Sequence, residues 1–495
     1  MVRPVEFPAA MEALVRVIED TAPSAIVAAT RAQLARGTKP ASLYVASALA
    51  VCRSSEIQID HHGGPLHPIA GLHALIDAGR RSGDDELAVV QATALANRHI
   101  HAPEGGPYVM AHIEPDAAPA DGAALLGAMD RFVPNVAEKH LVALLAAGKR
   151  AEAIFALLEI ALRRQPIDDH YPLYVGLTMR TLDAIGWEWA PVVLRPVARW
   201  LAMCPISVMR SDTESAYFRN KLDVYSRIPD IEALVERALA RKPRLATGPD
   251  EDAEIARLAE NLSALTDYDA IPEPLTQAIE AGLSLSGAGE ALGIAGATFH
   301  VRSNYGNPLD THIQNGIAVR RYLIGHAEVD LRHKVLGLLS WHTGPECRTA
   351  MGKMVHSARP ASEFPDLPQE PKALLAEMER GIAARKADRQ AAKTGRGRDA
   401  MRTGPGDRRA LGAADAYLAR GGEDGALIAS LARLVLRDDA TELHSASGFH
   451  DAVEMYEATR GNARARHLVS AAKIVLLGHD HGHEIWRAST GRLAA

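Results

Sequence analysis

The sequence has 495 residues, of which 47% are hydrophobic and only 5% aromatic, and its formal net charge at pH 7 is −6. The missing basic excess argues against a protein that binds nucleic acid over its whole surface. The three cysteines lie far apart and in no CxxC spacing, which argues against a disulfide framework or a zinc ribbon. The sequence contains neither a secretory signal nor a run of about 18 apolar residues, so we expect a soluble, cytoplasmic protein.

Apolar residues recur at helical spacing along almost the whole chain. The stretch 11–37 predicts two short amphipathic helices, and 140–164 predicts a helix pair with a turn at Gly148. The same period recurs in residues 231–242, 252–265 and 330–342. Alternating runs of Val, Ile and Thr are absent, so we predict an all-α protein, a multi-helical array or bundle of antiparallel helices that resembles a HEAT-type solenoid. A regular repeat is not expected, because no consensus recurs with a period of about 34 or about 40 residues.

Two segments differ from this pattern. Residues 284–300 are rich in glycine and lack a preceding strand, so we expect a flexible connection or a loop that passes close to a pocket. Residues 377–409 are basic and nearly free of large apolar side chains, and within them 394–407 are expected to form a mobile linker. This linker separates a main helical region, 1–376, from a C-terminal helical region, 410–495, that we expect to pack on the main region.

The 21 histidines are clustered, and neutral imidazole binds iron, zinc, copper and nickel. The stretch "DHHGGPLHPIAGLHAL" breaks one helix at Gly-Gly-Pro and starts another near Pro68. It places His62 and His67 on the loop at the mouth of the new helix and His73 inside it. These side chains are candidate metal ligands, with Asp60 as a further ligand or orienting group. The alternative is a capped helix start with His73 packed in the core.

Three further histidines are candidate site residues, of which only His312 is expected at a helix start, while His444 and His450 flank an expected turn. His312 follows Thr311, a candidate N-cap, and the helix dipole would keep its imidazole neutral, as a base or a ligand requires. His170 follows two aspartates, and His444 begins the stretch that contains His450. We take His170 and His312 as candidate catalytic residues and His444 as a candidate metal ligand. The tract "HDHGHE" near the end of the sequence is interpreted as incidental.

Established catalytic motifs are missing from the sequence, which has no HExxH, GxGxxG or GxxxxGK[ST] and no paired Glu-x-x-His. The last absence argues against a carboxylate-bridged di-iron bundle. Because no nucleotide motif is present, reducing equivalents would come from a partner protein, such as a reductase, or from a cofactor bound without one.

Three stretches together resemble the questin oxidase-like proteins: "HHGGPLHPIAGLHAL", "THIQNGIAVRRYL" and "ELHSASGFHDAVEMYEATRGNARARHLVSAAKIVL". The resemblance covers only these stretches. It implies an all-helical oxidoreductase with a Baeyer–Villiger-type oxidation of aromatic polyketides as the founding activity of the family. It also implies a histidine-lined pocket, which we carry over onto His62, His73, His312 and His444.

Three functions remain open at this point. The first is an oxidoreductase, a monooxygenase acting on a small organic substrate, with iron or another transition metal as the candidate ion. It predicts that at least three histidines meet in one cavity, from the set His62, His67, His73, His170, His312 and His444. The second is a non-catalytic helical scaffold, which predicts isolated histidines on an extended concave surface. The third is a regulator that binds nucleic acid or another anionic partner through residues 377–409.

Overall fold

The computed structural model describes residues 3–57, 64–102, 108–164, 169–203, 224–228, 230–304, 311–341, 351–391, 404–439, 444–477 and 483–490. Over these residues the chain is all-α, as predicted, and the only β-type pairings in them are two isolated bridges, Pro4 with Ala111 and Ser303 with Met354. No described helix combines the length and the hydropathy that crossing a membrane requires.

The first half of the chain forms the following helices: α1 (Ala9–Asp20), α2 (Ile26–Ala35), α3 (Pro40–Ser54), α4 (Leu66–Ser82), α5 (Asp85–Ile100), α6 (Gly122–Asp130), α7 (Pro134–Ala146), α8 (Arg150–Arg163), α9 (His170–Ile185), α10 (Ala190–Val193), α11 (Arg195–Leu201), α13 (Val224–Arg227) and α14 (Ile231–Ala240). The second half forms α15 (Asp252–Ser263), α16 (Pro272–Glu280), α17 (Leu285–Arg302), α18 (Thr311–Gly325), α19 (Leu331–Ser340), α21 (Pro371–Ala391), α22 (Pro405–Ala419), α23 (Asp424–Arg437), α24 (His444–Ala458), α25 (Ala465–Leu477) and α26 (Glu484–Ser489).

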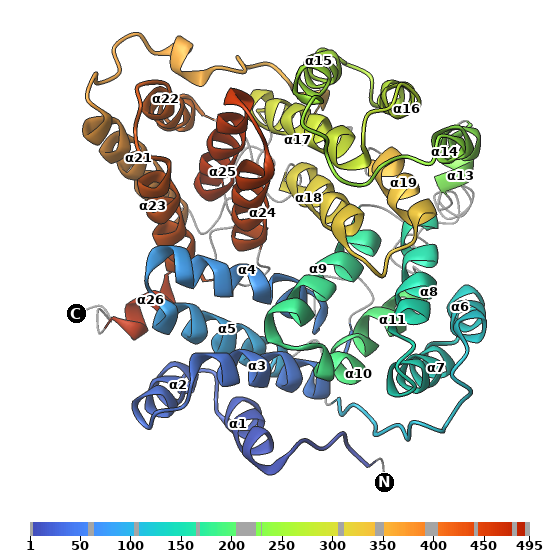
Figure 1. The fold of residues 1–495 in the computed structure, drawn as a ribbon. Helices are drawn as coiled ribbons and strands as arrows, with labels where there is room; N and C mark the ends of the chain where they lie inside the picture. The colour runs from blue at the N-terminus through green and yellow to red at the C-terminus, as the bar shows by residue number, and fades with distance from the viewer. Residues whose placement is uncertain are drawn as a thin grey trace, which may run out of the picture.

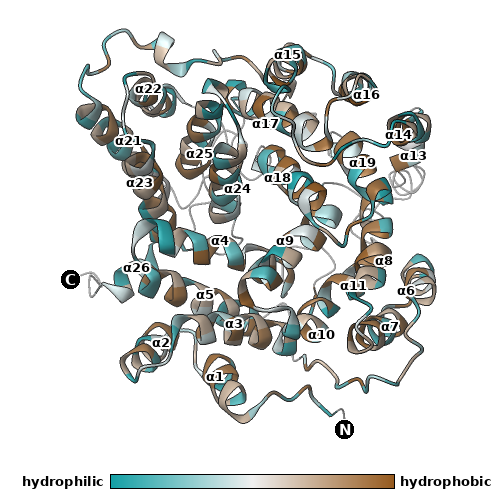
Figure 2. Ribbon diagram, in the orientation of Figure 1, coloured by the Kyte–Doolittle hydropathy of each residue, from teal (hydrophilic) through white to brown (hydrophobic). Residues whose placement is uncertain are grey.

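Short-range sequence signals set many of these boundaries. Asp84, Ser284 and Asp330 cap α5, α17 and α19, each accepting a hydrogen bond from a backbone N–H in the first turn. The predicted turn at Gly148 separates α7 from α8, and its φ of 72° is a left-handed value that glycine adopts without strain. Apolar faces turn inward across the molecule, where they form a core built mainly from Ala, Leu, Val and Ile (Figure 2).

Four helices, α4, α9, α18 and α24, form a closed inner ring (Figure 1). Each contacts the next around the ring, and α24 closes the circle by contacting α4. An outer helix precedes each inner one in the chain and packs against it: α3 before α4, α8 before α9, α17 before α18 and α23 before α24. The architecture is therefore built on four helix hairpins, although their separations along the chain are unequal.

The glycine-rich segment 284–300 is a helix, so the expectation of a loop there was wrong. It forms α17, which is buried along almost its whole length. Its glycines allow close packing against α18: a Cβ at Gly296 would lie 2.2 Å from Cδ1 of Ile317. Contact between helices, not turn geometry, explains why glycine recurs in this segment.

The C-terminal helices share one core with the rest of the chain. Helix α23 packs on α4, and α25 packs on α17. Helix α21 covers the first part of the basic segment and packs against α22, where Arg385 pairs with Asp407. Residues 405–407, which we expected in a mobile linker, form the first turn of α22. Pro405 suits this position, and the carboxylate of Asp407 accepts a hydrogen bond from the backbone N–H of Gly404. Residues 394–403 lie outside the described residues.

Candidate functional site

Four buried histidines meet where the inner helices begin. His170 and His444 are the first residues of α9 and α24, and His67 and His312 are the second residues of α4 and α18. Each is 6% exposed or less. Their rings form a closed circle with centroid distances of 5.8 Å for His67–His170, 4.8 Å for His170–His312, 5.3 Å for His312–His444 and 5.3 Å for His444–His67. We call this group the four-histidine cluster.

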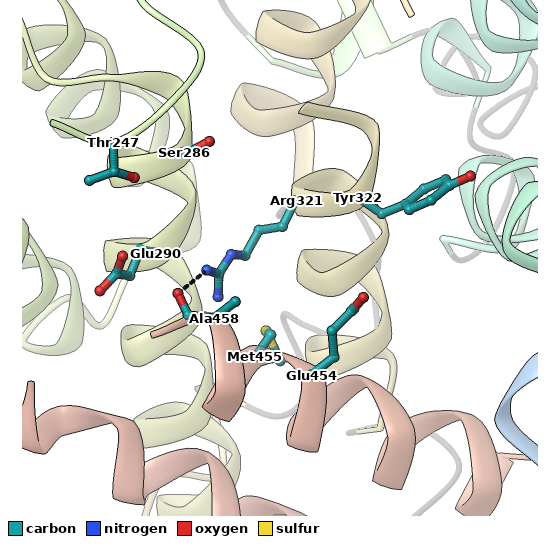
Figure 3. A pocket seen from close by; sticks show the side chains of 8 residues that line it. All are labelled: Thr247, Ser286, Glu290, Arg321, Tyr322, Glu454, Met455 and Ala458. Carbon is teal, nitrogen blue, oxygen red and sulfur yellow. Dashed lines mark hydrogen bonds between the residues drawn. The ribbon is translucent and has the colours of Figure 1, made fainter. Parts of the chain in front are cut away.

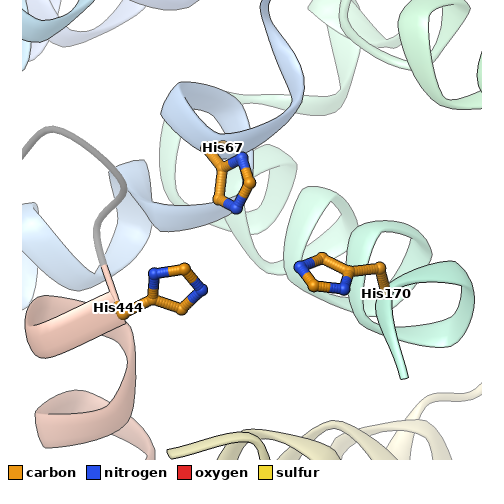
Figure 4. Close-up of side chains that lie close together, drawn as sticks. All are labelled: His67, His170 and His444. Carbon is orange, nitrogen blue, oxygen red and sulfur yellow. The ribbon is translucent and has the colours of Figure 1, made fainter. Parts of the chain in front are cut away.

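Three of these imidazoles lie close enough together that they could hold a single ion. Potential ligand atoms of His67, His170 and His444 all lie within 4.8 Å of one another, and their rings face a common centre (Figure 4). Metal–nitrogen bonds of about 2.0–2.1 Å would place such atoms about 3–4 Å apart. Small side-chain rotations are therefore enough to bring the three nitrogens onto one transition-metal ion.

Glycine allows the inner helices to approach one another at this level. A glycine follows three of the four histidines after one helical turn, as Gly71, Gly316 and Gly448. A Cβ at Gly448 would lie 2.5 Å from Cγ2 of Thr311, and one at Gly316 would lie 2.6 Å from Oδ2 of Asp169. Gly316 and Gly448 thus leave room for the start of the neighbouring helix.

A buried ion pair fixes two of the helix starts relative to each other. Asp169, directly before His170, accepts hydrogen bonds of 2.7 and 2.6 Å from the guanidinium of Arg320 on α18. Arg320 also donates to the carbonyl oxygens of Gly316 and Gly337, at 2.9 and 2.8 Å. Bidentate charge-assisted pairing of this kind has little geometric freedom, so it holds the first turn of α9 against α18.

The cavity at the cluster is small and mainly apolar below the imidazoles. It has room for little more than a water-sized ligand, about 20 Å³, and its walls continue with Ala70, Leu173 and Leu177. Tyr174 adds a hydroxyl that lies 3.2 Å from Nδ1 of His67. None of the described residues that line this cavity is a carboxylate. A divalent ion held here would keep its full charge, and the positive ends of four helix dipoles also point to this place.

The structure therefore brings together four of the six histidines predicted from the sequence. His67, His170, His312 and His444 share the cavity. The structure places His73 elsewhere: six residues along α4 correspond to about 9 Å of helical rise, and this carries His73 away from His67. His62 and Asp60 lie outside the described residues.

His73 belongs to a second polar group deeper in the ring. It packs against His450 with a ring-centroid distance of 4.8 Å, next to the buried carboxylate of Asp451. Burial lowers the pKa of His73 well below its usual value, and the nearby His450 and Arg180 act in the same direction. Burial also raises the pKa of Asp451 to about 7, although the guanidinium of Arg180 opposes this shift.

A larger cavity of about 290 Å³ lies farther along the inner helices (Figure 3). Its walls include Tyr322 on α18, Glu454 on α24 and Glu290 on α17. Arg321 extends into it and donates to the carbonyl oxygen of Ala458 at 3.2 Å. Glu454 also pairs with Arg180 at 2.6 Å, so this cavity borders the second polar group.

Sequence reasoning missed the roles of Arg320, Tyr174 and Asp451, because each gains its meaning only from a neighbouring helix. One local signal was present: a histidine followed by glycine four residues later recurs at three of the inner helix starts. The same spacing also occurs at His101 and His333, so it is not specific without the fold. The tract "HDHGHE" is described only from His483, whose Nε2 lies 3.3 Å from Oδ1 of Asp438.

Comparisons with family models, curated proteins and solved structures found no match for this chain. The resemblance to the questin oxidase-like proteins stays a prediction from the three sequence stretches.

Proposed function

We propose that this protein is an oxidoreductase of the oxygenase type, in which the four-histidine cluster holds a transition-metal ion and a small organic substrate is oxidised with dioxygen. The observation that carries the proposal is the meeting of four buried imidazoles from four helices in one cavity. His67, His170 and His444 are the metal ligands. His312 is a fourth ligand or the base that handles a substrate proton.

The chemistry of the donor set supports this assignment. Neutral imidazoles suit iron, copper, nickel and zinc. The hydroxyl of Tyr174 lies 3.2 Å from Nδ1 and 3.3 Å from Nε2 of His67, so it is a polar neighbour of that ring. Iron, or another redox-active transition metal such as copper, would supply the dioxygen activation that an oxygenase of this kind uses.

The reaction class can be written with its electrons balanced. One oxygen atom of dioxygen enters the substrate, and the other leaves as water after taking up two protons and two electrons from a reductase partner or a reduced nicotinamide. The bound ion would supply dioxygen activation. At about 20 Å³ the cavity has room for a diatomic gas beside an ion. An organic substrate does not fit inside it and would have to approach the ion at the edge of the cavity. An anionic substrate, such as a phenolate or an enolate, is favoured because the donor set leaves the charge of the ion uncompensated.

The alternative, a non-catalytic helical scaffold, expects histidines packed singly. The mutual contacts of four histidine rings favour the enzyme instead.

Elemental analysis of the purified, tag-free chain tests the proposal. We expect His67→Ala/His170→Ala to lose one equivalent of transition metal relative to wild type. His467→Gln is the matched control, because His467 is equally buried but lies outside the cluster, where its Nε2 is 3.1 Å from Oγ1 of Thr459. An unchanged metal content in the double variant would refute the metal site.

A second experiment tests the oxidation itself. Wild type with a generic reductase system and isotopically labelled dioxygen is incubated with phenols and aromatic ketones. Mass spectrometry should detect products that carry one labelled oxygen atom, and these products should be missing with His67→Ala/His170→Ala. Products that appear equally with both proteins would show that the cluster does not carry the chemistry.

A further inference from the structure

Two of the inner helices repeat their histidines at the same interval. His73 follows His67 by six residues on α4, and His450 follows His444 by six residues on α24. The second pair therefore forms another layer inside the ring, at a ring-centroid distance of 4.8 Å. Asp451 completes this layer: potential ligand atoms of His73, His450 and Asp451 all lie within 4.8 Å of one another.

Buried atoms of two of these side chains are left without hydrogen bonds within the described part of the chain. They are Nε2 of His73 and Oδ2 of Asp451. His73 is 6% exposed and Asp451 is fully buried. Unpaired buried polar atoms are costly and uncommon in folded proteins. Two such atoms in one small group indicate a ligand that would satisfy both.

The opposite atom of each side chain is held by the surrounding structure. Nδ1 of His73 lies 3.4 Å from Oγ1 of Thr181, and Oδ1 of Asp451 accepts a hydrogen bond of 2.8 Å from Arg180. His450 Nδ1 lies 2.9 Å from Oδ2 of Asp77, which leaves Nε2 of His450 to face a ligand. A carboxylate behind a histidine is the usual outer-shell arrangement of metal-binding imidazoles.

The charges around this layer nearly balance. Its ion-paired groups comprise four carboxylates and three guanidiniums, namely Asp77, Asp451, Glu454 and Glu457 with Arg80, Arg81 and Arg180. Arg321 adds a fourth guanidinium near Glu454 in the adjoining cavity. The 290 Å³ cavity adjoins this layer, because Glu454, which lines the cavity, pairs with Arg180. The side chain of His450 is itself 15% exposed.

We infer that His73, His450 and Asp451 form a second binding site for a divalent transition-metal ion. Two imidazoles and one carboxylate are a donor set that iron, manganese and zinc accept. Six residues of helix place this ion about 9 Å from the four-histidine cluster. This separation is longer than the metal–metal distance of about 3.5–4 Å in bridged two-metal sites. The second ion is therefore mononuclear, and it links α4 to α24 below the first site.

Metal stoichiometry of paired variants tests this inference. Wild type should bind two equivalents of added Co²⁺ after chelator treatment, and Asp451→Asn should bind one. The asparagine keeps an oxygen that can accept from Arg180, so the fold is preserved while the anionic ligand is lost. His450→Gln is the second variant, and it should also bind one equivalent. At 15% exposure, His450 tolerates replacement better than the fully buried aspartate. His467→Gln should retain two.

The outcomes separate this inference from the proposed function. Loss of one equivalent in Asp451→Asn and His450→Gln, with a different equivalent lost in His67→Ala/His170→Ala, supports both sites. Loss only in the Asp451 and His450 variants supports the second site and refutes the four-histidine one. Wild-type stoichiometry in both Asp451→Asn and His450→Gln overturns the inference, whatever the other variant does.

Discussion

Gly316 provides a sharp test of how closely the inner helices must approach. A Cβ at this position would lie 2.6 Å from Oδ2 of Asp169 and 3.0 Å from the indole of Trp341, well inside the 3.4 Å at which ordinary contact begins. Neither neighbour can move easily, because Asp169 is held by two hydrogen bonds from Arg320 and Trp341 is fully buried. Gly316→Ala should therefore overpack the core, at a cost of about 1–3 kcal/mol in the free energy of unfolding.

Gly325 is the matched control on the same helix. It is exposed, and a Cβ there would meet nothing within 4 Å. Gly→Ala gains up to about 1 kcal/mol of helix propensity inside a helix and less at Gly325, the last residue of α18. The difference between the two variants is therefore a lower bound on the cost of overpacking. Urea unfolding followed by circular dichroism measures this difference, and metal analysis measures the effect on the cluster. Gly316→Ala that unfolds at the same or a higher urea concentration than Gly325→Ala would refute the reasoning.

Three further predictions concern buried charges. Arg320→Leu leaves the Asp169 carboxylate buried without its guanidinium, and urea unfolding should show a loss of about 3–5 kcal/mol, whereas Asp169→Asn/Arg320→Leu should lose less; equal losses would contradict this. Burial, with help from nearby guanidiniums, lowers the pKa of His467 to about 3, so the unfolded chain binds the extra proton between about pH 6.5 and about pH 3. As pH is lowered through this range, this group should reduce the free energy of unfolding by about 1.4 kcal/mol per pH unit. In urea titrations, His467→Gln should show a smaller decrease. For His333 burial alone would lower the pKa, but two hydrogen-bonded carboxylates, one from Glu159, raise it overall. Wild type should therefore be more stable than His333→Gln by the largest amount below about pH 6.5, and this difference should shrink as pH rises through the folded pKa of His333. A difference that grows as pH rises would contradict the prediction.

Much of the fold was accessible from the sequence because it depends on local signals. Helical spacing of apolar residues, capping side chains and the turn at Gly148 all act within one or two turns of helix. The failure at 284–300 shows the limit of such signals. Glycine there serves contact with a helix that comes later in the chain, and no local pattern distinguishes this use from a loop.

The candidate site was accessible only in part, for a related reason. Histidine at a helix start is a local feature, but the sequence predicted it only for His312. His67 was expected on a loop and His444 beside a turn, whereas all four cluster histidines lie in a first helical turn. Which histidines share a cavity depends on the order of helices around the ring. The sequence grouped His73 with its near neighbour on α4, whereas six residues of helical rise place it in a different layer.

The composition of the cluster itself argues for the kind of ligand that it accepts. A carboxylate at a helix N-terminus is stabilised by about 0.3–1 kcal/mol, so a site where four helices begin would be a favourable place for aspartate or glutamate. The described lining of this cavity instead carries only imidazole, phenol, amide and hydroxyl groups among its polar side chains. Asp169, the acidic residue next to His170, is neutralised by Arg320. Among the described residues, no carboxylate of the cavity lining compensates the positive potential at the helix starts. An anionic ligand on an ion held there would occupy the position that such a carboxylate would otherwise take.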